Sequence, residues 1–234
     1  MTLSPQVRYL IRFLALAYVL VLLVVPVGLI LWRTFTPGFG QFFAWVSTPA
    51  AISALNLSLL VVAIVVPLNV LFGVPTALML ARNRFRGKGV LQAIIDLPFA
   101  VSPVVVGVAL IVLWGSAGLL GFVERDFGFK IIFGLPGIVL ASVFATLPSI
   151  RWGLTYGIVL TIARTLGEYG AVIMVSSNLP GRSQTLTLLV SDRYNRGAEY
   201  GAYALSTLLM AVSVVVLVVQ VIFDARRKRA TKQT

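Results

Sequence analysis

The sequence contains no cysteine and no histidine. A chain without thiols or imidazoles forms no disulfide and lacks the sulfur and nitrogen ligands that hold zinc or iron–sulfur clusters. Charge is also scarce, because only 11% of the 234 residues are charged and none lies between Arg33 and Arg82. These absences exclude a thiol enzyme, a histidine-based metal site and a soluble domain, which needs far more polar surface.

Long apolar stretches dominate what is present, since 59% of the residues are hydrophobic. A helix of about 20 apolar residues crosses a bilayer, and six stretches approach or exceed that length: 13–32, 55–80, 91–114, 131–147, 149–174 and 202–223. The first is too long for the apolar core of a signal peptide (about 7–15 residues), and no small-residue cleavage site follows it, so we expect a retained span. The sequence predicts an all-α polytopic membrane protein, a single domain over residues 1–234 with six transmembrane helices.

The net charge of +12 reflects basic residues at the ends of these spans rather than a nucleic-acid-binding surface. With six spans, twelve basic residues fall on the side of the two termini and six on the other side. The positive-inside rule therefore predicts cytoplasmic termini. Six of the twelve are expected to anchor the cytoplasmic interface, and the tail also to bind anionic lipid: Arg82, Arg84, Arg86, Lys88, Arg226 and Arg227.

Two charged residues, Arg164 and Glu168, lie inside the fifth predicted span. Ionisable residues at membrane depth face a protein interior or a water-filled path and usually mark function. Their spacing of four places both on one face of a continuous helix. They either form an internal ion pair or line a translocation pathway. In a pathway the forked guanidinium of Arg164 suits a tetrahedral oxyanion, and Glu168 either tunes that charge or holds the helix against a partner subunit. Gly167 and Gly170 are expected to permit close helix packing.

The third predicted span is interrupted by Asp96, Pro98, Ser102 and Pro103. A broken helix persists at membrane depth only where neighbours or a cavity satisfy its backbone. A carboxylate followed by two prolines and a serine favours a functional break, so these four residues are further candidates for the pathway. Asp96 lies only about two turns inside the span and can also reach the interface.

Several motifs resemble one protein family. The segment Arg164-Thr-Leu-Gly-Glu-Tyr-Gly-Ala-Val172, with Ser176-Ser-Asn-Leu-Pro-Gly181 and Ser183-Gln-Thr-Leu-Thr-Leu188 after it, is similar to the inner-membrane permeases of sulfate/thiosulfate ABC importers. The segment Asp96-Leu-Pro-Phe-Ala-Val-Ser-Pro-Val-Val-Val-Gly107 looks like the third-span signature of that group, closer to its W-type subunit than to the T-type partner or to molybdate permeases. The resemblance covers nearly the whole chain.

The resemblance implies an ABC importer permease fold with six spans. It also implies that the protein imports sulfate or thiosulfate through the bacterial inner membrane. It also implies a T-type permease partner, a cytoplasmic ATPase dimer and an extracytoplasmic sulfate-binding protein. No GxxxxGK[ST] loop or nucleophile–base constellation occurs, so we expect no enzyme activity, no metal and no cofactor in this chain, with ATP used by the ATPase. Molybdate or tungstate stays open as the cargo, because these dianions share the shape and charge of sulfate.

One segment of the family is missing from the sequence. Permeases of this group carry a cytoplasmic coupling loop between the fourth and fifth spans, bounded by two Leu-Pro pairs, whereas here a single pair ends at Pro148 and Ser149 begins the next span. The missing piece starts and ends on one side of the membrane, so topology survives, with a tight turn at Pro148 anchored by Arg151.

This departure leads to a prediction about coupling. We expect the chain to insert but to couple poorly or not at all to ATP hydrolysis. Two alternatives stay open: docking of the ATPase through residues 82–88 and the basic tail, or a non-functional deletion variant.

Overall fold

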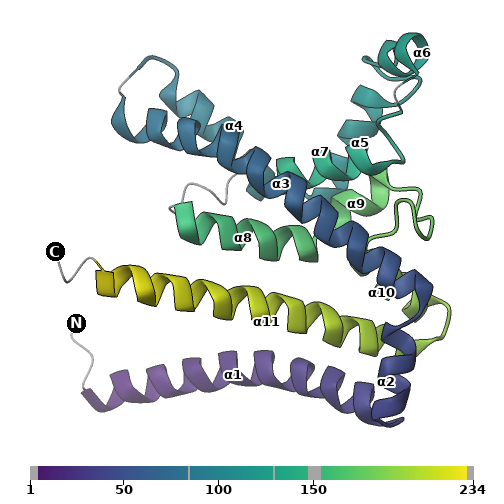
Figure 1. The fold of residues 1–234 in the computed structure, drawn as a ribbon. Helices are drawn as coiled ribbons and strands as arrows, with labels where there is room; N and C mark the ends of the chain where they lie inside the picture. The colour runs from purple at the N-terminus through teal and green to yellow at the C-terminus, as the bar shows by residue number, and fades with distance from the viewer. Residues whose placement is uncertain (1–4, 84, 129, 147–153, 231–234) are drawn as a thin grey trace.

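The computed structural model describes residues 5–83, 85–128, 130–146 and 154–230 of the chain. These residues form helices and no strand, as the sequence predicted (Figure 1). The helices are α1 (Pro5–Phe35), α2 (Phe39–Val46), α3 (Pro49–Arg82), α4 (Lys88–Ala100), α5 (Pro103–Trp114), α6 (Phe122–Phe127), α7 (Leu135–Thr146), α8 (Leu154–Gly167), α9 (Gly170–Val175), α10 (Leu186–Asn195) and α11 (Glu199–Ala230).

Three helices of the described residues, α1, α3 and α11, are long and apolar enough to cross a membrane. They contain the predicted spans 13–32, 55–80 and 202–223. At a rise of 1.5 Å per residue, the 34 residues of α3 extend about 50 Å, well beyond the roughly 30 Å of a hydrocarbon core. The start of α3 is fixed locally, because the Thr48 hydroxyl accepts the N–H of Ala51 at 3.3 Å and Pro49 occupies the first turn.

The other predicted spans are interrupted or short. The third predicted span is broken into α4 and α5, which are bent by 105° relative to each other. If this bent pair is counted as one span, the described residues contain four helical segments of membrane-crossing length instead of three. The fourth predicted span contains the 12-residue α7, and the fifth is divided between α8 and the six-residue α9. The predicted turn at Pro148 and Arg151 lies outside the described residues, and the count of six spans stays a prediction.

Both termini lie at the same end of the molecule (Figure 1). The turn that joins α3 to α4 and the beginning of α8 point toward that end, whereas α2, α6 and α10 lie toward the opposite end (Figure 1). We call these the terminal end and the far end. A chain that crosses a membrane an even number of times has both ends on one side, as in this arrangement.

The core lies where α3, α7, α9 and α10 meet. Its centre is formed by fully buried aliphatic side chains: Val61, Val65, Ile138, Val172 and Leu188. Helices α5 and α9 pack against each other at Gly107, where a Cβ atom would lie 2.5 Å from the Cβ of Met174 and 3.0 Å from the carbonyl oxygen of Ala171. Only a residue without a side chain allows this approach.

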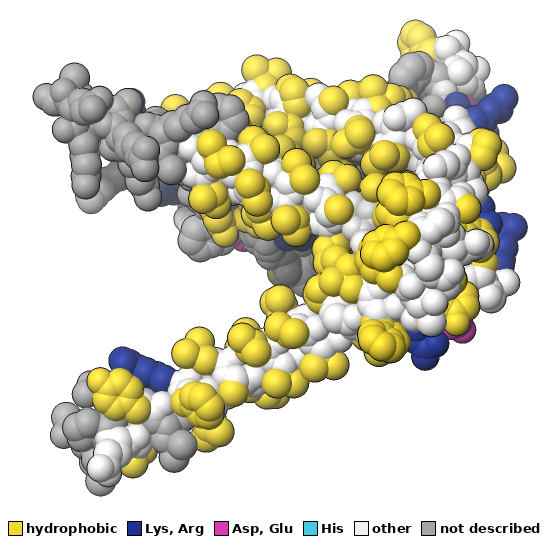
Figure 2. Space-filling model, turned by 60° about the horizontal axis from the view of Figure 1, so that its bottom comes forward, with side chains coloured by type: hydrophobic (Ala, Val, Ile, Leu, Met, Phe, Trp, Pro, Cys, Tyr) yellow, Lys and Arg dark blue, Asp and Glu magenta, His cyan; other side chains and the backbone are white. Residues whose placement is uncertain are grey.

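Helix α1 is attached to the rest of the molecule mainly through its C-terminal part. There the buried hydroxyls of Thr34 and Thr207 on α11 are hydrogen-bonded at 2.8 Å. The membrane-length apolar window of α1 has no buried residue. Figure 2 shows this helix as a separate arm whose surface is almost entirely hydrophobic.

Substituting Gly107 by Ala tests the contact between α5 and α9. The added methyl group meets backbone as well as side chain, so we expect a loss of about 1–3 kcal/mol of stability from overpacking. Thermal unfolding of the purified protein in detergent measures it. Gly28→Ala is the matched control, because a Cβ there meets nothing within 4 Å. Equal melting temperatures for the two variants would contradict the packing described here.

Candidate functional site

Two helix breaks lie against each other. A Cβ atom on Gly170, the first residue of α9, would lie 3.0 Å from the Cβ of Pro103 and 3.6 Å from the backbone nitrogen of Val104. The N-terminal ends of α5 and α9 therefore lie side by side. The structure thus brings together candidates that the sequence placed in two separate spans.

The break between α4 and α5 follows Pro98, which is buried inside α4. The chain is extended at Val101, and helix α5 restarts with Pro103 in its first turn. Ser102 occupies the N-cap position of α5 and is exposed, and its side chain makes no capping hydrogen bond. Asp96 lies half-buried in the last turns of α4. This break is about 20 Å along α4 from its first residue.

The break between α8 and α9 is organised by Glu168. The side chain is buried, and its Oε1 accepts the N–H of Ala171 at 3.0 Å. The hydroxyl of Thr187 donates to the backbone oxygen of Glu168 at 3.1 Å. The carboxylate therefore satisfies a backbone donor of the first turn of α9, as a capping residue does.

The predicted common helix face of Arg164 and Glu168 is wrong. Helix α8 ends at Gly167, so no continuous helix carries both residues. Arg164 lies half-buried in the last turn of α8, and Glu168 belongs to the junction that starts α9. The ion pair between the two residues and their place in a pathway stay predictions.

The two glycines beside Glu168 differ. Gly170 makes the close approach to Pro103 described above. Gly167 is exposed, and a Cβ atom there would meet nothing within 4 Å among the described residues. Gly167 makes no close approach among the described residues, and its packing role stays a prediction.

Three of the predicted cytoplasmic anchors lie at the turn between α3 and α4, at the terminal end. Arg82 and Arg86 are exposed on either side of the turn between α3 and α4, and Lys88 donates to the backbone oxygen of Asn83 at 3.4 Å. Arg84 and the side chains of Arg226 and Arg227 lie outside the described residues.

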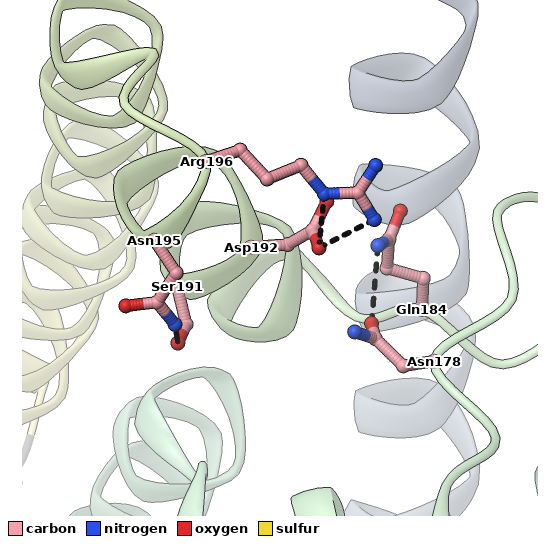
Figure 3. A network of polar contacts seen from close by, with 6 residues as sticks. All are labelled: Asn178, Gln184, Ser191, Asp192, Asn195 and Arg196. Atoms are coloured by element: carbon pink, nitrogen blue, oxygen red, sulfur yellow. Dashed lines mark hydrogen bonds and ion pairs between the residues drawn. The ribbon is translucent and has the colours of Figure 1, made fainter.

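A polar network holds the connection between α9 and α10 at the far end (Figure 3). The Ser176 hydroxyl donates to the backbone oxygen of Ser183 at 2.5 Å, and Gln184 Nε2 donates to Asn178 Oδ1 at 3.0 Å. Directly after α10, Arg196 forms an ion pair with Asp192 of that helix at 2.8 Å. The turn itself depends on Asn178 and Gly181, which have positive φ angles of 50° and 76°. The connection is thus fixed by its own hydrogen bonds.

One buried polar contact was not predicted from the sequence. Asn69 of α3 is fully buried, and its Nδ2 donates to the Thr146 hydroxyl at 2.5 Å, which in turn donates to the backbone oxygen of Ser142 at 2.6 Å. This contact ties α3 to the last residue of α7. The available signal was an asparagine in the apolar run 55–80, where an amide needs a partner.

The sequence is similar to those of known permeases over most of its length. The chain is 34% identical to the sulfate transport system permease protein CysW of Synechococcus elongatus, over 94% of its own length and 90% of the relative. The chain belongs to the CysW family. The CysW protein of Escherichia coli (strain K12) is 32% identical over 82% of this chain and 80% of that protein. A probable sulfate permease cysT from Zygnema circumcarinatum is 27% identical over 93% of this chain.

No family model matches the chain. Among solved structures, a bacterial ABC transporter involved in alginate import has a TM-score of 0.67 at 16% identity, covering 94% of this chain and 96% of that one. A second structure, of an alginate ABC transporter in complex with a periplasmic protein that holds an alginate pentasaccharide, has a TM-score of 0.63 at 18% identity over 92% of both chains. These likenesses show the ABC importer permease fold. The CysW family member described here is a multi-pass membrane transporter subunit and not an enzyme.

The chain also differs in length from its relatives. The alignment with the Synechococcus protein extends over 257 positions, whereas 94% of the 234 residues is only about 220 residues. More than thirty positions of that relative therefore face no residue of this chain. The Escherichia coli relative gives the same result, with 233 positions against 82% of 234 residues, about 192 residues.

Substitutions of Glu168 test its structural role. Glu168→Ala leaves the N–H of the buried Ala171 without its acceptor, so we expect a loss of about 1 kcal/mol or more. Glu168→Gln retains an acceptor oxygen and should lose much less. Thermal unfolding of the three proteins in one detergent provides the comparison. If both variants lost stability equally, the charge and not the cap would be the important property.

Proposed function

We propose that the chain is the W-type permease subunit of an ABC importer that moves sulfate or thiosulfate into the cytoplasm. The 34% identity to a CysW protein along nearly the whole chain carries this proposal. In this proposal the protein lies in the bacterial inner membrane with both termini in the cytoplasm. The excess of basic residues at the terminal end supports that orientation. Molybdate and tungstate are not favoured, since the relatives are named for sulfate.

The partners in this proposal are a T-type permease, a cytoplasmic ATPase dimer that uses ATP, and an extracytoplasmic sulfate-binding protein. The T-type relative supports the second permease. The structural neighbour in complex with its periplasmic protein supports delivery by a binding protein. The far end, with its rigid connection between α9 and α10, is the surface that would meet such a protein.

The translocation pathway is proposed to pass the two helix breaks. The N-terminus of α5 carries a positive partial charge and an exposed hydroxyl at Ser102, and both favour a dianion. Arg164 supplies the full positive charge, and its guanidinium suits the oxygen atoms of a tetrahedral anion. Pro98 and Pro103 produce the break, Asp96 belongs to the segment that leads into it, and Glu168 holds the second break in shape.

The coupling loop is proposed to be absent from this chain, between α7 and α8. The more than thirty unmatched positions of the relatives support this proposal, as does the short chain between Thr146 and Leu154. Without the loop, the permease offers the ATPase no evident contact surface through which closure of the ATPase could move its helices. We therefore expect a protein that inserts but is uncoupled, unless residues 82–88 and the basic tail suffice for docking.

Uptake of labelled sulfate tests the function and the missing loop together. The chain as it stands and a version with a family coupling loop inserted after Pro148 are expressed in a strain that lacks its own CysW. We expect uptake only with the loop, because only that version transmits the ATPase stroke. Membrane levels and co-purification with the ATPase are the controls. Uptake by the unmodified chain would contradict the uncoupling, and uptake of molybdate instead of sulfate would contradict the proposed cargo.

Arg164 is tested in the version that carries the loop. Arg164→Gln removes a charged donor from the pathway, so we expect sulfate uptake to fall by about ten- to a hundredfold, with Arg164→Lys less affected. Arg12→Gln is the matched control, because Arg12 is exposed on α1 and lies outside both the breaks and the connection between α9 and α10. Unchanged uptake in Arg164→Gln, at an equal membrane level, would exclude this residue from the pathway.

A further inference from the structure

A cleft separates the C-terminal part of α3 from the first half of α4. Its volume is about 490 Å³, and residues of both helices line it. The walls are mostly apolar, with Phe72, Ala77 and Leu80 on α3 and Leu91, Ile94 and Ile95 on α4. This size lies within the usual range of small-molecule sites, roughly 300–1,000 Å³.

The cleft is polar and basic at one end. Lys88 lines it where α4 begins, and the exposed Arg82 and Arg86 flank the same turn. Helix α4 starts after Gly87, which has a φ of 92° and provides no side-chain cap. The first backbone N–H groups of α4 therefore add positive partial charge to the charge of the three basic side chains.

The negative charge of the cleft lies away from this end. Asp96 is the acidic residue among the lining residues. It follows Lys88 by eight residues on the same helix, which corresponds to about 12 Å along α4. The cleft thus runs from a basic mouth, where the chain turns at the terminal end, between apolar walls toward the break near Ser102.

We propose that this cleft binds an anionic phospholipid. An acyl chain lies between the apolar walls of α3 and α4, and the phosphate contacts Lys88, Arg82 and Arg86 at the mouth. Charge and polarity favour a lipid as the occupant, because an amphiphile with one negative end matches an apolar cleft with one basic end. A protein helix from a partner would leave the basic mouth without a counter-charge. This proposal goes beyond transport and holds whichever anion the importer carries.

Lipid binding would have a structural consequence for the pathway. The cleft lies between α3 and α4, and α4 leads directly into the break at Val101 and Ser102. A lipid chain between them fixes the separation of α4 from α3. The occupant of the cleft therefore sets the position of the segment that precedes the break.

Native mass spectrometry of the purified full chain tests the proposal. Phosphatidylglycerol and phosphatidylcholine with identical acyl chains are titrated into the protein in detergent. We expect phosphatidylglycerol to bind more tightly, with Lys88→Gln weakening its affinity about fivefold and Arg82→Gln/Lys88→Gln weakening it further. Arg12→Gln is the matched control, because Arg12 is exposed at the terminal end but belongs to α1.

A second variant separates the cleft from general surface charge. Ala77→Phe fills the cleft without changing any charge and should reduce phosphatidylglycerol binding as well. Circular dichroism and gel filtration establish that each variant is folded. The proposal is wrong if the two lipids bind equally, if Arg12→Gln loses as much affinity as Lys88→Gln, or if Ala77→Phe binds like the parent. Displacement of the lipid by inorganic phosphate, or by a co-expressed T-type permease, would also contradict it.

Discussion

The hydrogen bond from the Ala171 N–H to the Glu168 carboxylate is the contact on which the interior arrangement depends. A helix that stops inside a membrane leaves unpaired backbone groups, and the hydrocarbon of the bilayer has no hydrogen-bond partners for them. Glu168 supplies the missing acceptor within the chain, so α9 can start at Gly170 after the break. Helix α9 packs against α5, where Gly107 and Gly170 allow close contact. Glu168, which the sequence indicated as a pathway residue, thus has a structural role as the acceptor at the start of α9.

Much of the fold could be predicted from the sequence, because a long apolar segment in a bilayer must satisfy its own backbone hydrogen bonds and therefore forms a helix. Residues 13–32, 55–80 and 202–223 each lie within one long helix, and the prolines and the serine near residue 100 indicated the break that the structure contains. The break at Glu168 could not be predicted from spacing, since no proline marks it and a buried carboxylate can act as a cap or as an ion-pair partner. Asn69 and Thr146 are far apart in the chain, so their contact follows only from the packing of α3 on α7.

The packed core and the proposed site of the coupling loop lie in different parts of the chain. The packed core of α3, α7, α9 and α10 is complete within the described residues and includes α7, the helix that precedes residues 147–153. Asn69 holds the end of α7 through Thr146, and this contact needs no residue beyond α7. With the coupling loop absent, as proposed, the chain retains the contacts that position α7. Loss of a segment that transmits force need not disturb the contacts that give the fold.

The arm formed by α1 has a consequence for how the protein sits in its membrane. Its apolar part, Ile11–Phe35, extends about 37 Å, and the helix is held mainly where Thr34 meets Thr207. A hydrophobic helix longer than the bilayer core accommodates the mismatch by tilting. The packed helices cannot change their angle without disrupting the core, but α1 can. Bilayer thickness therefore acts on this chain first through the tilt of α1, and membranes of different lipid composition will hold that helix at different angles around an unchanged core.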